Sequence, residues 1–283
     1  MALFSLLVAI LVERMKLLPS GWQFDSVMTR YQKQFWDSQS LKSPFGVVIA
    51  IVLPALLVLL ISFLLDGIFF DLLSLLFWVL ISIICFSHQT LRIVFKQYIQ
   101  AACRGDVQAC YCYASELDST EHLDVVDEQD LGRKVGQMVA WINYRYYGAV
   151  ALYLIFLGPV GAVLYCTVRF YSEYNSKNKL EMPLVDRLQM IFDWLPSRVF
   201  SFGYVLSGQF SSGLSVWRQY GLSVNTDAKT IVTHTAVAAE SLPEVGDAPL
   251  SVQSTLALLA LSKRNFVLLL TMVSVLTIFG FIS

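Results

Sequence analysis

The chain has 283 residues, of which 56% are hydrophobic, and its mean hydropathy is +0.61. This apolar content exceeds what the interior of a soluble domain holds, so we expect lipid to cover the excess. A formal net charge of −1, with no basic segment apart from the apolar runs, excludes nucleic acid as a partner.

The positive charges are distributed unevenly along the chain. All twenty Lys and Arg residues lie in clusters that alternate with apolar runs nearly free of charge, so all of them can be placed on one side of a membrane. Membrane proteins keep such cations in their cytoplasmic loops. The sequence therefore predicts a multi-pass protein whose cationic loops face the cytoplasm.

The N-terminal third is predicted to cross the membrane repeatedly. Residues 1–18 form a first span, and residues 19–46 form an interfacial helix and loop in which aromatic and polar side chains alternate. Residues 47–86 form a transmembrane hairpin. Its first arm, Val47 to Leu65, has 19 residues without a charge, and the chain turns at Asp66.

Residues 87–138 are predicted to form a cytoplasmic helical region that includes an acidic run. Carboxylates can bind a divalent cation, but these are irregularly spaced and lack the glycine of an EF-hand loop. We interpret the run as a solvated loop, made of Glu116, Asp118, Glu121, Asp124, Asp127, Glu128 and Asp130.

Residues 139–174 decide the topology, because this apolar segment is interrupted at Gly158 and Pro159. One straight span would place the cations from Arg169 to Arg264 outside, against the orientation rule. Two helices that enter and return at the break keep every cation inside. Non-helical backbone is tolerated at membrane depth where protein covers it. We therefore predict a broken segment of re-entrant or paired helices.

The C-terminal part is predicted to hold cytoplasmic and interfacial helices over residues 175–264 and a last span over residues 265–283, which follows the cations Lys263 and Arg264. The predicted fold is thus an all-α integral membrane protein with about four full spans, a broken re-entrant or paired segment, and helical cytoplasmic regions.

Motifs of common enzymes are missing from the sequence. The stretch Gly203 to Gly208 lacks the Lys-Ser/Thr of a phosphate-binding loop, and the Cys110-x-Cys112 pair has no second pair with which to hold zinc. The three histidines are scattered. We predict no catalytic residue, no metal site and no cofactor.

Three arginines lie beside apolar or aromatic sequence, where a cation is costly unless it meets an anion or water: Arg145, Arg169 and Arg198. The paired-helix arrangement would bring Asn143, Arg145 and Arg169 to the same open end of the helix pair. Arginines grouped in this way suit the binding of phosphate or carboxylate groups. The alternative is that these arginines anchor helix ends at the cytoplasmic surface.

Four stretches resemble the AmpE family, inner-membrane proteins paired with beta-lactamase induction in gamma-proteobacteria. They are Met1-Ala-Leu-Phe with Glu13-Arg14, Ala140-Trp-Ile-Asn-Tyr-Arg-Tyr146, Asp193-Trp-Leu-Pro-Ser-Arg198, and Leu276-Thr-Ile-Phe-Gly280. The resemblance covers nearly the whole chain. It implies a bacterial inner-membrane protein that acts in signalling, in the response to antibiotics.

The AmpE family is in turn similar to the CobD/CbiB family, membrane enzymes of cobamide biosynthesis that use ATP. Partial counterparts of that family's motifs are Arg104-Gly105-Asp106 and Asp193 to Arg198. Acidic positions of that family fall on residues that cannot hold magnesium: Met138, Ile142 and Tyr146. The likeness therefore implies a protein that keeps a synthase-like fold without the acids of the enzyme.

Two functions follow from these resemblances. The first is a regulatory or sensory protein, linked to beta-lactamase induction and cell-wall recycling, that binds an anionic small molecule or a regulatory protein in a cytoplasm-facing cleft. The alternative is a membrane-bound ATP-dependent ligase or synthase of the cobamide-biosynthesis type. The predicted ligand-binding residues are Arg104, Asp106, Asn143, Arg145, Arg169, Asp193 and Arg198.

Overall fold

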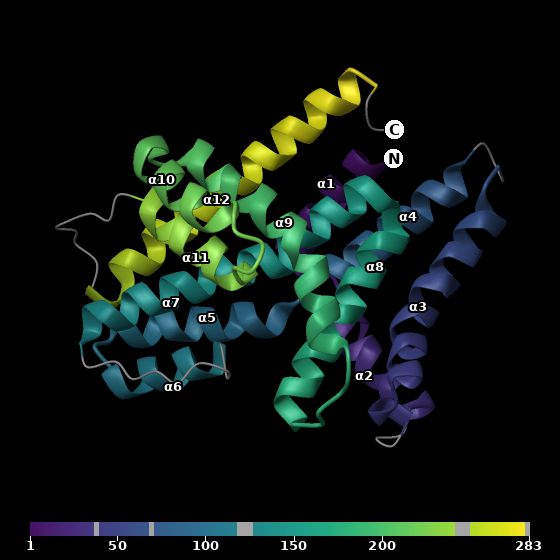
Figure 1. Cartoon of the computed structure of the whole chain (residues 1–283), viewed down its shortest axis with the longest axis horizontal. Coiled ribbons are helices and arrows are strands. Elements are labelled where there is room, and N and C mark those ends of the chain that lie inside the picture. Colours follow the sequence, from purple (N-terminus) through teal and green to yellow (C-terminus); the bar gives the residue numbers. More distant parts are fainter. Residues whose placement is uncertain (37–39, 68–70, 118–126, 241–249, 281–283) are drawn as a thin grey trace. The chain divides into compact units, whose positions relative to one another are not determined.

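The computed structural model describes residues 1–36, 40–67, 71–117, 127–240 and 250–280. Every regular element in these residues is a helix (Figure 1), which confirms the all-α prediction for this part of the chain. Of the seven acidic residues in the predicted loop, Asp118, Glu121 and Asp124 lie outside the described residues. The loop interpretation is wrong for three others, because Glu116 lies in the helix Val107–Leu117, and Glu128 and Asp130 lie in the helix Glu128–Asn143.

The helices gather into two compact units, each made of pieces that are separated in sequence. The first unit comprises Met1–His88, Ala149–Phe192 and Met272–Ser283, and the second comprises Gln89–Gly148 and Asp193–Thr271. We describe each unit by itself.

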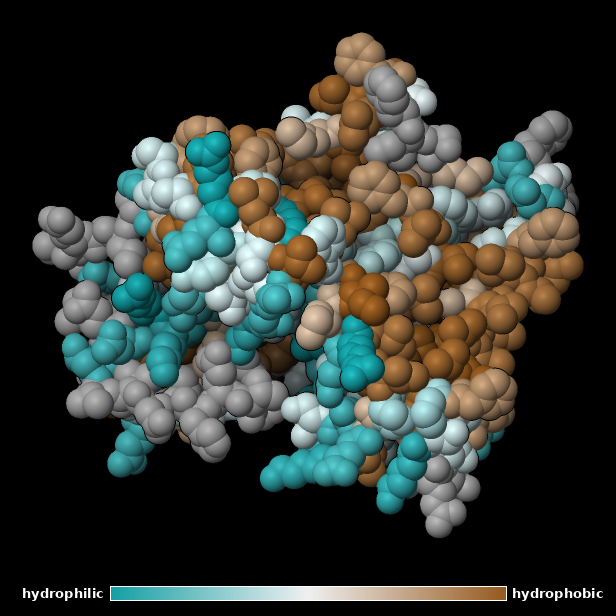
Figure 2. Space-filling model, in the orientation of Figure 1, coloured by the Kyte–Doolittle hydropathy of each residue, from teal (hydrophilic) through white to brown (hydrophobic). Residues whose placement is uncertain are grey.

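The first unit contains α1 (Ala2–Met15), α2 (Phe24–Phe35), α3 (Pro44–Leu65), α4 (Leu72–Phe86) and α8 (Ala149–Asn178). Helix α1 packs against α4, and both α3 and α4 pack against α8. Helix α3 begins with a proline in its first turn, where no helical N–H is needed. Its outward side chains are apolar along its length, as the brown surface over α3 in Figure 2 shows.

Three described segments are long and apolar enough to cross a membrane: Pro44–Leu65, Asp130–Asn178 and Val252–Ile278. The bent pair Leu72–Phe86 and Gln89–Cys103 makes a fourth if it is counted as one span. These segments support a multi-pass membrane protein, whereas the count of about four full spans stays a prediction. Helix α1 has 14 residues and ends before the predicted limit of residue 18.

Helix α8 folds back on itself at the predicted break. Gly158 has φ 67° and ψ −160°, a backbone conformation that no helix contains. The rings of Tyr153 and Tyr165 stack with their centroids 5.0 Å apart. In a straight helix these two residues would be separated by about 18 Å along the axis. The two arms of α8 therefore lie side by side, whereas their place in a membrane stays a prediction.

The turn of α8 is held against α4. A Cβ atom on Gly158 would lie 2.9 Å from the Trp78 ring. A glycine is thus needed at this position for two reasons: its positive φ and the close approach of an indole ring. The sequence signal Gly-Pro indicated a break, and the contact with Trp78 explains why the break is tight.

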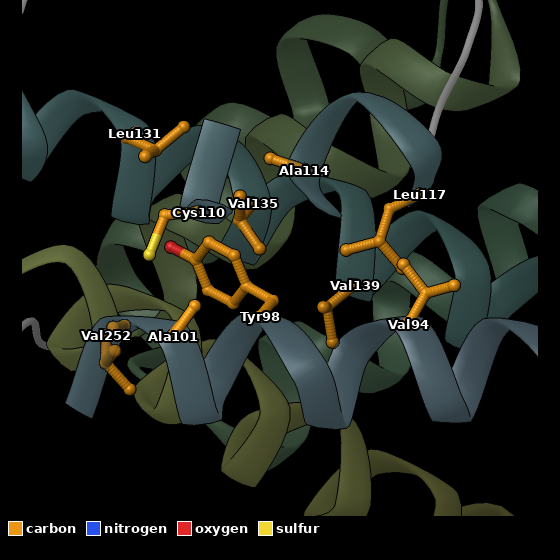
Figure 3. Close-up of a cluster of buried hydrophobic side chains, with 11 residues drawn as sticks. Val94, Tyr98, Ala101, Cys110, Ala114, Leu117, Leu131, Val135, Val139 and Val252 are labelled. Carbon is orange, nitrogen blue, oxygen red and sulfur yellow. The ribbon is translucent and has the colours of Figure 1, made fainter. Parts of the chain in front are cut away.

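The second unit contains α5 (Gln89–Cys103), α6 (Val107–Leu117), α7 (Glu128–Asn143), the π-helical turn η3 (Tyr144–Gly148), α10 (Phe210–Gly221) and α11 (Ala228–Ala239). Most of α9 (Val185–Ser207) and of α12 (Leu250–Ile278) also belongs to it. Figure 3 shows part of its core, in which Tyr98 of α5 lies among small apolar side chains of α6, α7 and α12, including Cys110, Val135 and Val252.

Polar contacts join α12 to its neighbours in this unit. Thr255 Oγ1 donates to Gly132 O at 2.8 Å, and Asn265 Nδ2 donates to Phe200 O at 2.9 Å. The Arg264 guanidinium pairs with Glu240, just after α11. Helix α12 is one helix from residue 250 and runs through residue 265, where the last span was predicted to start.

We expect Gly158→Ala to lower the free energy of unfolding by about 1–3 kcal/mol, because alanine disfavours this backbone conformation and its methyl group meets Trp78. Thermal unfolding of the purified protein in detergent measures the effect. Gly67→Ala is the matched control, since Gly67 also has a positive φ but has nothing within 4 Å of its Cβ position. Equal losses in the two variants would contradict the role of the Trp78 contact.

Candidate functional site

The resemblance to the AmpE family is most specific in two stretches, residues 140–146 and residues 193–198, and these come together in the second unit. Tyr144, from the stretch Ala140 to Tyr146, donates its hydroxyl to Asp193 Oδ1 at 2.8 Å, across 49 residues of sequence. Asp193 is buried, with 3% of its surface exposed. We call this pair, together with Arg145, the next residue after Tyr144, and Arg198 of α9, the Tyr144–Asp193 site.

A π-helical turn positions Tyr144. The turn η3 follows α7 directly and holds one residue more per turn than an α-helix, a feature that is frequent at functional sites. Gly148 closes the turn against α9, because a Cβ there would lie 2.5 Å from two atoms of the Phe200 ring. The Tyr144 ring also contacts Phe200, with centroids 5.7 Å apart. The turn therefore presents Tyr144 to the middle of α9.

Arg145 and Asn143 flank Tyr144 but make different contacts. The Arg145 guanidinium carbon lies 5.8 Å from the centre of the Trp141 ring, within the range of a cation–π interaction, and the side chain is half-buried. Asn143 Nδ2 donates to Val139 O at 2.8 Å. Its amide thus turns back onto its own helix, while Arg145 lies on an aromatic face.

Arg198 is a clamp between α9 and the end of α10. Its Nε donates to Gly221 O at 3.0 Å, and its Nη2 donates to Ser223 O at 2.6 Å. Its Nη1 donates to Trp194 O at 2.7 Å, and the guanidinium carbon lies 4.3 Å from the centre of the Trp194 ring. A cation that donates to carbonyl oxygens at a helix C-terminus is favoured by the helix dipole. Three of its donors are therefore committed to holding the fold.

The predicted element Arg104-Gly105-Asp106 is the turn between α5 and α6. The N–H groups of Gly105 and Asp106 donate to Ala102 O and Ala101 O, which closes the end of α5 in a Schellman motif with Gly105 at φ 71°. Asp106 Oδ1 accepts from Ala109 N at 3.0 Å and caps the start of α6. The element thus has a clear local role in connecting two helices.

Arg169 belongs to the first unit, whereas the other six predicted ligand-binding residues belong to the second. It is buried, with 1% of its surface exposed, and its Nη2 lies 3.3 Å from Asp25 Oδ1 of α2. A buried arginine needs an acidic partner, and this ion pair fixes α2 against α8. The predicted grouping of Arg169 with Asn143 and Arg145 at one end of the helix pair stays a prediction.

Sequence reasoning missed two residues of these contacts. The predicted ligand-binding residues included Asn143 and Arg145 but not Tyr144 between them. A tyrosine in a motif with polar neighbours can signal a buried hydroxyl that needs a hydrogen-bond partner. No sequence signal marked Asp25, which lies 144 residues from Arg169. Among the described residues, no group of three or more His, Cys, Asp and Glu side chains is arranged to hold a metal ion.

The helical architecture and the candidate spans define the chain as an α-helical membrane protein of the multi-pass class. It belongs to the AmpE family: residues 1–283 match the family of the regulatory signalling modulator protein AmpE. It is 26% identical to Protein AmpE of Shigella flexneri over 288 residues, an alignment that covers 99% of each chain. No solved structure matches the chain.

We expect Tyr144→Phe to lower the free energy of unfolding by about 1–3 kcal/mol, because the buried Asp193 carboxylate loses a donor. Chemical unfolding in detergent, followed by circular dichroism, checks this. Tyr220→Phe serves as the control, since Tyr220 is half-buried in the same unit and its ring contacts His234. A loss no greater than in this control would show that the Tyr144 hydroxyl contributes nothing to stability.

Proposed function

We propose that this protein is an inner-membrane regulatory protein that acts in beta-lactamase induction and cell-wall recycling, and that the Tyr144–Asp193 site binds an anionic small molecule or a regulatory partner. Its membership of a family of regulatory signalling modulators supports the general role. The observation that carries the proposal is the hydrogen bond between Tyr144 and Asp193, because it joins the two stretches in which the family likeness is most specific.

Arg145 is the residue that we propose as the first contact for an anion. Arg198 donates three hydrogen bonds to backbone carbonyls, and Arg169 forms an ion pair with Asp25. Arg145 is half-buried on the Trp141 ring, so part of its surface is open to an approaching group. The planar guanidinium of an arginine matches the geometry of phosphate and carboxylate groups.

The binding proposal can be tested with inorganic phosphate and the purified protein. We expect phosphate to raise the melting temperature, and Arg145→Gln to reduce this shift by at least half. Arg218→Gln is the matched control, because Arg218 is an exposed cation of the same unit on α10. If Arg145→Gln and Arg218→Gln respond alike to phosphate, Arg145 does not bind the anion.

The regulatory role requires a test in cells. In a strain that lacks its own copy, we expect the wild-type gene to restore the normal response of beta-lactamase activity to a beta-lactam inducer. We expect Arg145→Gln to fail, although membrane extracts contain as much protein as wild type. If deletion of the gene leaves both basal and induced beta-lactamase activity unchanged, the regulatory role in this pathway is wrong.

We propose that the cationic loops face the cytoplasm and that the folded-back α8 enters and leaves the membrane on that side. The stacking of Tyr153 on Tyr165 supports this topology, because side-by-side arms return the chain to its starting level. Arg169 and Lys177 then lie on the same side as the other cations, as the orientation rule favours.

Labelling of single cysteines tests this topology in intact cells. We expect Asn178→Cys, exposed at the end of α8, to resist a membrane-impermeant maleimide until the membrane is opened. Asp66→Cys, exposed at the turn after α3, should react directly because it lies on the opposite side. Direct labelling of the cysteine at position 178 would overturn the proposal.

The alternative of an ATP-dependent ligase draws no support from the described residues. Such an enzyme uses carboxylates to hold magnesium against the phosphates. Asp193 is occupied by Tyr144, and Asp106 caps α6. The family to which the chain belongs is described as regulatory.

A further inference from the structure

Helix α9 has the opposite polarity to a helix on a water-covered surface. Its polar residues Asp193, Ser197 and Ser201 recur every four positions and are buried, with 0–3% of their surface exposed. Its outward residues are apolar: Leu195, Val199 and Leu206 are 61%, 46% and 42% exposed. Residues four apart share a face of a helix, so these are two distinct faces.

The buried polar groups find their partners inside the protein. Asp193 accepts from Tyr144, and Arg198 donates to three backbone carbonyls. These are the only charged residues from Leu188 to the end of α9, and both are buried. The outward face of this part of the helix therefore carries no charged side chain.

Other helices of the second unit have the usual polarity. In α7, Leu131 and Val135 are buried while Arg133 is exposed, and in α10 the residues Ser215 and Arg218 are exposed. The reversal in α9 is thus not a general property of the unit. Polar groups turned inward and apolar groups turned outward are typical of helices that lie in lipid.

Helix α9 also contacts a segment that can cross a membrane. Asn265 of α12 donates to Phe200 O, and a Cβ atom on Gly203 would lie 2.1 Å from Asn265 Oδ1, so the two helices are in close contact. Helix α9 therefore packs against the candidate span Val252–Ile278 at Asn265.

We propose that lipid acyl chains cover the outward face of α9 from Trp194 to Leu206, although the composition of this helix does not qualify it as a span. The Tyr144–Asp193 site then lies behind a lipid-facing helix, on its protein side. This inference does not depend on the proposed regulatory role, because it concerns what covers the helix.

Spin labels on the full-length protein in vesicles of phosphatidylethanolamine and phosphatidylglycerol test the proposal. Single cysteines are placed at Leu195, Val199 and Leu206 after the exposed Cys103 and Cys112 are replaced by serine. Oxygen concentrates in hydrocarbon and a polar nickel complex stays in water. We expect the ratio of oxygen to nickel collisions at these sites to exceed that at Ser215→Cys by about threefold or more.

Each outcome decides the question. Equal ratios at the α9 positions and at the Ser215 control would show that water covers the face. Low collision rates with both reagents, together with spectral broadening that falls when unlabelled protein is added, would show that a second copy covers it. Both results would overturn the proposal. Circular dichroism of each variant establishes that the helices are intact.

Discussion

A polar group beside lipid must find its hydrogen-bond partner inside the protein, and this constraint organises much of the structure. Arg169 meets Asp25, Asp193 meets Tyr144, and Asn265 meets a carbonyl of α9. Each of these contacts joins two helices that are distant in sequence. Buried polar contacts of this kind cost desolvation, so they contribute more to fixing which helices meet than to the total stability.

Arginine illustrates how one residue type serves different purposes in this protein. The sequence pattern grouped Arg145, Arg169 and Arg198 as possible ligands of one anion. In the structure, Arg198 closes the end of a helix, Arg169 holds α2 through a carboxylate, and Arg145 lies on an indole ring. Arg169 and Arg198 are buried in contacts within the protein, and both the binding interpretation and the anchoring of helix ends at the cytoplasmic surface stay predictions. Only Arg145 has the partial exposure that a ligand contact needs.

The local features of the chain could be predicted from sequence, and the long-range ones could not. An uncharged apolar run marked α3, and Gly158-Pro159 marked the fold-back of α8, because both signals are contained in neighbouring residues. The contact between Tyr144 and Asp193 depends on the packing of η3 against α9, which no periodicity encodes. Lys263 and Arg264 marked the predicted start of the last span, and α12 continues through them as one helix in which Arg264 pairs with Glu240.

The interleaving of the two units has a consequence for how the protein is made. The chain passes from one unit to the other four times, so neither unit corresponds to a continuous stretch of sequence. The first unit has all of its pieces only when residues after Met272 have left the ribosome, and its early helices must wait in the membrane for α8. A premature stop anywhere before that point leaves both units incomplete. Quality control would therefore treat such a product as a single misfolded protein rather than as one intact unit with a missing neighbour.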